Sequence, residues 1–94
     1  MSPEEFAESD LGTPDDALRA LWFARRGEWD KAHDIAQSDD SRNGAWIHAY
    51  LHRVEGDTVN ANYWYRRAGR PVQEGNLDAE WERIVQELLQ QNNR

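Results

Sequence analysis

Hydrophobic residues recur at intervals of three and four along most of this chain, a pattern that predicts amphipathic helices separated by short polar breaks. The clearest stripe begins at Leu77 with intervals of four, three and four. A shorter stripe starts at Trp29 and stops at the polar loop that begins with Ser38. The predicted long helices span residues 15–26, 44–55, 58–69 and 77–91. The first of these is apolar on nearly every side, which is typical of a central buried helix.

Helix start signals precede several of these stripes. Residues 2–5, with the sequence Ser-Pro-Glu-Glu, have the order of a capping box and predict a short helix over 3–9. Residues 13–16, with the sequence Thr-Pro-Asp-Asp, repeat the signal after a break at Gly12. Asp57 and Asn76 are the predicted N-caps of the last two long helices.

No stretch alternates apolar and polar residues as a half-buried strand would, so the predicted fold class is all-α. At 94 residues the chain is expected to form one domain, residues 1–94. Within it we distinguish an acidic N-terminal segment (1–13), two helix pairs (15–71) and a C-terminal amphipathic helix (77–91).

The two middle helix pairs repeat each other at an offset of 29 residues, which places Gly27 on Gly56. The same offset places small residues on small ones where helices must approach closely. These pairs are Ala20 with Ala49 and Ala32 with Ala61. Gly56 is expected to end one helix with a positive φ angle, which glycine adopts with least strain.

One motif of the second helix pair resembles the tetratricopeptide repeat and, more closely, the related Sel1-like repeat. Its residues are Gly56, Asp57, Ala61, Trp64, Tyr65 and Ala68. The resemblance covers about residues 15–71. It implies two helix-turn-helix units of the right-handed α-α superhelix type, which bind a protein or peptide on a concave face.

Charge and composition argue against several classes of partner. The formal charge is −7, and the first 16 residues contribute six acidic residues and no basic one. An acidic chain is a poor general binder of nucleic acid, whose phosphates need clustered lysine and arginine. The chain lacks cysteine, has no apolar run long enough to cross a bilayer, and opens with acidic rather than basic residues, unlike a signal peptide. We therefore expect a cytoplasmic protein without nucleic-acid or membrane partners.

Two histidines are the clearest departure from the repeat pattern. His48 and His52 are four residues apart and hence on one helix face, a spacing that can hold a metal ion. His33 could be a third ligand if the fold brings it near. The alternative is that the histidines are partly buried packing residues that form hydrogen bonds with their neighbours. We hypothesise that His48 and His52 line a polar pocket near Trp64 or Tyr65.

Aromatic and basic residues suggest a second surface. Tyr63, Trp64 and Tyr65 are consecutive, so at least one of them should face solvent, a groove or a partner. A basic cluster follows them and could bind an anion or an acidic peptide, or could simply suit a helix C-terminus. The cluster consists of Arg66, Arg67 and Arg70.

We expect a non-enzymatic protein- or peptide-binding module without catalytic residues, cofactor or assigned metal ligands. The candidate binding residues are those of the two surfaces just described. The alternative is a small-molecule or metal-binding protein that uses the His48/His52 face. A homodimer is also expected, because we do not expect a single neighbour to cover the whole stripe of the last helix. The self-association residues would be Trp81, Ile84, Val85 and Leu88.

Overall fold

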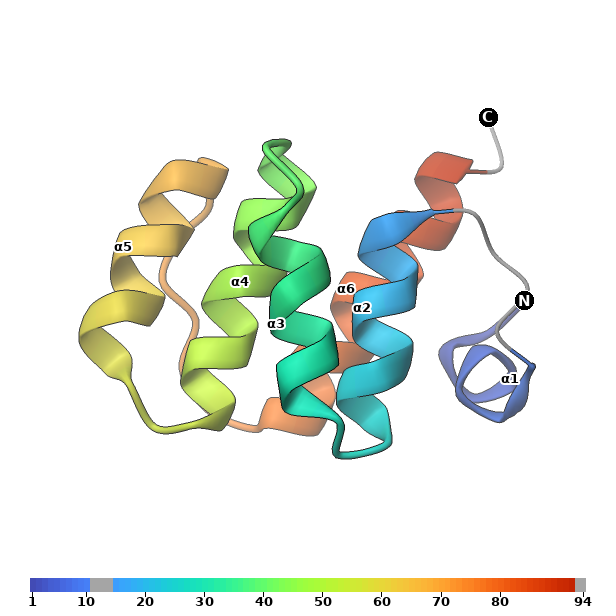
Figure 1. Cartoon of the computed structure of the whole chain (residues 1–94). Coiled ribbons are helices and arrows are strands. Elements are labelled where there is room, and N and C mark those ends of the chain that lie inside the picture. The colour runs from blue at the N-terminus through green and yellow to red at the C-terminus, as the bar shows by residue number, and fades with distance from the viewer. Residues whose placement is uncertain (11–14, 93–94) are drawn as a thin grey trace.

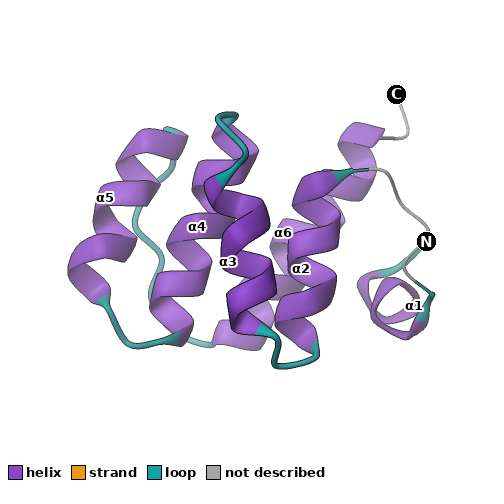
Figure 2. Ribbon diagram, in the orientation of Figure 1, coloured by secondary structure: helices purple, strands orange, loops and turns teal. Residues whose placement is uncertain are grey.

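The computed structural model describes residues 1–10 and 15–92, and within these residues it contains helices and no strands (Figure 2). The helices are α1 (Pro3–Glu8), α2 (Asp16–Arg25), α3 (Trp29–Gln37), α4 (Arg42–Val54), α5 (Thr58–Ala68) and α6 (Leu77–Asn92). The predicted all-α class is confirmed, and the predicted helices recur with small shifts at their ends. The break expected at Gly12 and the Thr13-Pro14 part of the second start signal lie outside the described residues.

The predicted N-caps form the expected hydrogen bonds. In the capping box of α1, Glu5 N donates to Ser2 Oγ and Ser2 N donates to Glu5 Oε1, both at 3.1 Å. The Asp57 side chain accepts from Asn60 N at 3.2 Å, and the Asn76 side chain accepts from Ala79 N at 2.9 Å. Each cap satisfies a backbone donor that the first helical turn leaves free.

Four helices stand side by side in one row, in the order α5, α4, α3, α2 (Figure 1). Each packs against the next, so α2 with α3 and α4 with α5 form two consecutive helix pairs. Helix α6 crosses behind the row and packs on α2 and α4, and α1 lies at the α2 end against α2 and α6. Helix α5 therefore lies at one end of the molecule, and α1 lies at the other, beyond α2.

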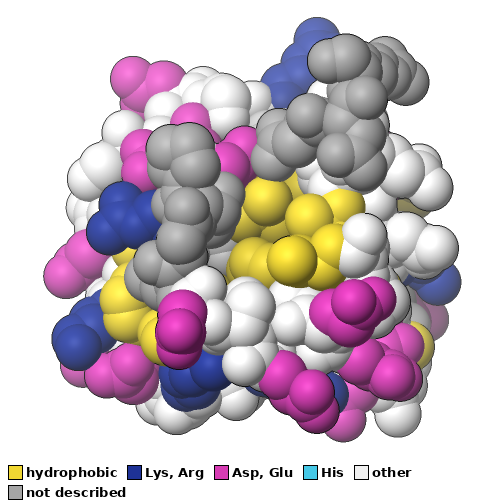
Figure 3. Space-filling view, turned by 90° about the vertical axis from the view of Figure 1, so that its right-hand side faces the viewer, with side chains coloured by type: hydrophobic (Ala, Val, Ile, Leu, Met, Phe, Trp, Pro, Cys, Tyr) yellow, Lys and Arg dark blue, Asp and Glu magenta, His cyan; other side chains and the backbone are white. Residues whose placement is uncertain are grey.

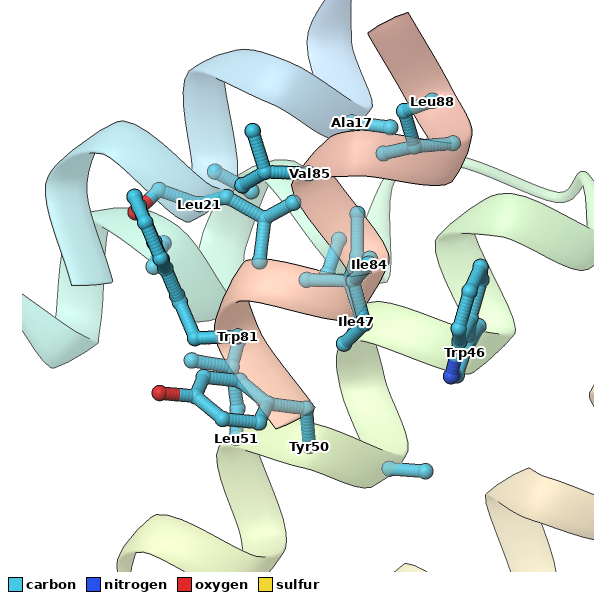
Figure 4. Packing of buried hydrophobic residues seen from close by; sticks show 14 of the residues in the cluster. Ala17, Leu21, Trp46, Ile47, Tyr50, Leu51, Trp81, Ile84, Val85 and Leu88 are labelled. Carbon is cyan, nitrogen blue, oxygen red and sulfur yellow. The ribbon is translucent and has the colours of Figure 1, made fainter. Parts of the chain in front are cut away.

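The core is closed by α6, whose apolar stripe faces the row (Figure 4). Trp81, Ile84, Val85 and Leu88 are each at most 1% exposed, and the Trp81 indole N–H donates to Leu21 O at 2.9 Å. The expectation that this stripe stays partly uncovered for a second copy is therefore wrong, because α1, α2 and α4 cover it. The homodimer itself stays a prediction without a surface assigned to it.

Two glycines fix how the helices join. Gly56 has a φ of 82° between α4 and α5, as predicted, and Gly27 has a φ of 75° at the equivalent turn between α2 and α3. Gly44, in the first turn of α4, is required for a different reason. A Cβ atom there would lie 2.3 Å from Asp39 O, so only glycine lets the loop after α3 approach α4 this closely.

Two further properties of the described residues concern one face of the molecule and the hydropathy of its helices. At the end of the molecule that carries α1, hydrophobic side chains gather at the centre of the face with acidic and polar groups around them (Figure 3). None of the helices in residues 1–10 and 15–92 has the length and hydropathy that a bilayer-crossing segment needs.

Candidate functional site

The fold brings all three histidines of the chain together between α3 and α4. His33 projects from α3, while His48 and His52 occupy successive turns of α4. His33 Nε2 and His48 Nε2 are 3.0 Å apart, and one ring nitrogen from each histidine lies within 4.8 Å of the other two. The sequence allows His33 as a third ligand only if the fold brings it near His48 and His52, and the fold does so.

The three imidazole rings have a defined mutual orientation. His48 and His52 are stacked, with ring centroids 5.0 Å apart and planes inclined by 17°. The His33 ring stands almost perpendicular to both, at centroid distances of 4.7 Å from His48 and 5.7 Å from His52. The ring of α3 thus points its edge at the stacked pair of α4, so that nitrogens from both helices converge.

Two tryptophans wall the cluster. Trp64 of α5 stacks on His48 with centroids 3.8 Å apart, and Trp29 of α3 stacks on His33 at 4.7 Å. The Trp29 indole is itself held by a hydrogen bond to Leu51 O at 2.8 Å. The predicted position near Trp64 is confirmed for His48, and the His48 and His33 rings each lie against a flat aromatic neighbour that restricts their rotation.

The surroundings of His48 favour its neutral imidazole. Burial, together with the neighbouring His33 and His52, lowers the pKa of His48 to about 4. His48 is only 4% exposed, and its Nδ1 has no hydrogen-bond partner among the described residues. A neutral imidazole keeps one nitrogen lone pair, so His48 is able to act as an acceptor or a metal ligand at neutral pH.

His52 is oriented by a carboxylate. Its Nδ1 lies 2.6 Å from Glu55 Oε1, three residues further along the chain. When Nδ1–H donates a hydrogen bond to this carboxylate, Nε2 retains the lone pair. Carboxylate–histidine pairs of this kind commonly fix the tautomer of a metal-binding histidine.

A second buried polar group lies between α4, α5 and α6, and sequence reasoning missed it. Glu80 is 3% exposed and accepts hydrogen bonds from Arg53 and from the Tyr65 hydroxyl. Arg53 also donates to Gly75 O at 2.7 Å. One signal was available, because Glu80 lies four residues before Ile84 and so falls in line with the buried stripe of α6.

Tyr65 belongs to this network and is not a surface residue. It is fully buried, and its pKa is raised, first by burial and then by its hydrogen bond to Glu80. Its place in the predicted binding surface is therefore wrong, because the side chain is buried and its hydroxyl is bound by Glu80. Of the three consecutive aromatics, Tyr63 is the one that faces solvent, with 43% of its surface exposed.

The predicted basic cluster divides into two parts. Arg70 is tied to α6, because its Nη2 lies 2.6 Å from Glu87 Oε1 and its guanidinium covers the Trp46 ring at 3.5 Å. Arg66 and Arg67 are exposed on α5, and Arg67 Nη1 donates to the Tyr63 hydroxyl at 3.2 Å. The structure thus leaves two arginines available on the surface instead of three.

Comparisons with family models, with curated proteins and with solved structures found no match to this chain. The resemblance to tetratricopeptide and Sel1-like repeats therefore stays a prediction from the motif residues.

Proposed function

We propose that this protein is a non-enzymatic binding module of tetratricopeptide-like type that docks an acidic protein or peptide segment on the outer face of α5. The observation that carries the proposal is the composition of this face. Val59 is 81% exposed and Tyr63 43%, and Arg66 follows on the same side of the helix, at intervals of four and three residues. Large apolar side chains beside free cations are typical of a surface that meets an acidic partner.

Charge supports this choice of partner. Neither Arg66 nor Arg67 forms an ion pair with a carboxylate in the described part of the chain, whereas Arg53 and Arg70 both do. Arg67 lies over the Tyr63 and Trp64 rings at 5.9 and 5.5 Å, so it presents its guanidinium next to aromatic surface. A segment that carries both carboxylates and an apolar side chain would engage all of these groups.

The place of α5 supports the proposal as well. It stands at the end of the helix row, so its outer face is not covered by another helix of the described chain (Figure 1). In a repeat array this end is where a further helix pair would stack. The repeat type, the homodimer and the cytoplasmic location are parts of this proposal and not observations.

Fluorescence anisotropy tests the proposal with three labelled peptides of equal length that share a central Leu-Leu pair flanked by Glu, Ser or Lys. Only the Glu peptide should bind well. Because hydrogen bonds to charged groups contribute about 1.5–3 kcal/mol, the double change Arg66→Ala, Arg67→Ala should weaken it about tenfold or more.

The matched control for this experiment is Arg83→Ala, which removes an exposed arginine of α6 and should change nothing. Equal binding of the three peptides, or equal loss in the control, would contradict the proposal.

A further inference from the structure

We propose that His33, His48 and His52 form a site for one divalent transition-metal ion, with Zn²⁺ as the ion that the donor set suits best. This proposal is independent of peptide binding on α5. It rests on the geometry of the rings, on their surroundings and on the hydrogen bonds that the cluster does and does not form.

The spacing of the rings fits three ligands of one ion. A Zn–N bond of about 2.0–2.1 Å places the centroids of two imidazole ligands roughly 5 Å apart in a tetrahedral site. The three observed centroid distances, 4.7, 5.0 and 5.7 Å, bracket this value. The separation of 3.0 Å between His33 Nε2 and His48 Nε2 is close to the roughly 3.3 Å edge of such a tetrahedron. The His48 and His52 rings are nearly parallel, so at least one of them would have to turn for both to bind one ion.

The hydrogen bonds leave the cluster unfinished as a purely structural feature. His48 is buried, yet among the described residues its only polar contact is with another histidine, and its Nδ1 has none. Burying a polar group without full compensation costs free energy. Coordination through Nε2 would replace the contact with His33 by a bond to the ion and would leave Nδ1 as it is.

The surroundings prepare the rings for coordination. Glu55 accepts from His52 Nδ1 at 2.6 Å, which leaves Nε2 free as a ligand. Trp29 and Trp64 hold the other two rings by stacking. Three nitrogen ligands leave one position of a tetrahedral site for water or for a group of a partner. The ion would also join α3 to α4, so its binding should stabilise the protein.

Calorimetric titration of the full chain, purified without a polyhistidine tag and treated with chelator, tests the proposal with Zn²⁺. We expect one ion per chain, a rise in melting temperature, and an intense visible absorption typical of tetrahedral sites when Co²⁺ replaces Zn²⁺. The variant His33→Phe keeps a ring against Trp29 but removes the ligand nitrogen. It should lose more affinity than the about 10–100-fold that removal of a supporting carboxylate costs.

Two further variants locate the ion. Glu55→Gln should weaken binding about 10–100-fold, because it removes the partner of His52. Asp57→Asn should leave binding unchanged. Asp57 belongs to the other group that could hold an ion, His52 with Glu55 and Asp57. Loss of binding in Asp57→Asn with retention in His33→Phe would move the ion to that group and overturn the proposal.

Folding of each variant is checked by circular dichroism, and His48→Phe, which like His33→Phe changes the three-histidine group alone, replaces it if the latter does not fold. The absence of saturable Zn²⁺ binding at hundreds of micromolar would equally overturn the proposal, as would undiminished affinity in the ligand variant.

Discussion

Glu80 and His48 are both buried polar side chains, with 3% and 4% of their surfaces exposed, yet their environments differ completely. Each carboxylate oxygen of Glu80 accepts a hydrogen bond, one from Arg53 and one from Tyr65. His48 has a histidine beside one ring nitrogen and no partner for the other in the described chain. The Glu80 carboxylate has its hydrogen bonds within the protein, whereas His48 keeps a ring nitrogen that forms no hydrogen bond in the described chain.

The comparison distinguishes the buried Glu80 network, which stabilises the fold, from the buried histidine cluster, which we propose binds a metal ion. Arg53 joins α4 to α6 and Tyr65 joins α5 to α6, so the Glu80 network connects three consecutive helices. The histidines connect only α3 and α4, which are already neighbours along the chain. Loss of the Glu80 network should therefore cost mainly stability, and loss of the histidines mainly ligand affinity.

The largest effect is expected for Glu80→Ala. This change leaves the Arg53 guanidinium and the Tyr65 hydroxyl without their partner in the core, and breaking a buried pair from one side costs about 3–5 kcal/mol. Urea unfolding followed by tryptophan fluorescence measures the loss. Glu82→Ala, at an exposed position of the same helix, is the control and should stay within about 0.5 kcal/mol. A similar loss of unfolding free energy in both variants would show that the Glu80 network does not stabilise the protein more than an exposed carboxylate does.

Alkaline pH should weaken the same network more gently. The pKa of Tyr65 is raised in the folded protein, so the folded state holds the phenol proton more tightly than the unfolded state does. The resulting stability is fully present below about pH 10, the ordinary tyrosine pKa, and is lost as the pH rises toward the raised value. Urea midpoints measured from pH 8 to pH 11 should fall. They should fall less steeply in Tyr65→Phe, and parallel slopes would show that another group is responsible.

The smallest effect on stability, and the largest on metal affinity, is expected for His52→Phe. The change copies Phe23 at the equivalent position and loses only a hydrogen bond to the exposed Glu55. The free energy of unfolding without metal should be equal or higher, while the calorimetric Zn²⁺ signal should disappear. An unfolded variant would instead show that the histidines belong to a structural hydrogen-bond network.

Much of the fold was readable from local patterns. The stripe that starts at Leu77 predicted α6, and Asn76 and Asp57 marked where helices begin, because capping and periodicity depend on neighbours within one or two turns. Gly56 was recognised for the same reason. The covering of the α6 stripe was not, because it depends on how α1, α2 and α4 are arranged around it.

The candidate site was readable only in part. The four-residue spacing placed His48 and His52 on one face, but the approach of His33 depends on how α3 packs against α4. Glu80 was missed because a carboxylate beside Trp81 is normally expected to face solvent. Tyr65 was misplaced because three consecutive aromatics cannot be sorted into inner and outer positions without the neighbouring helix.

The bond from Trp81 to Leu21 spans 60 residues of sequence, and this has a consequence for how the protein is made. A ribosome releases α2 to α5 before α6, so the growing chain carries an open groove where the stripe of α6 will lie. During that interval Arg53 has no carboxylate to pair with in the core, and Leu21 is uncovered. Folding can finish only after residues 77–92 have left the exit tunnel, because α6 closes the core that α2 to α5 leave open.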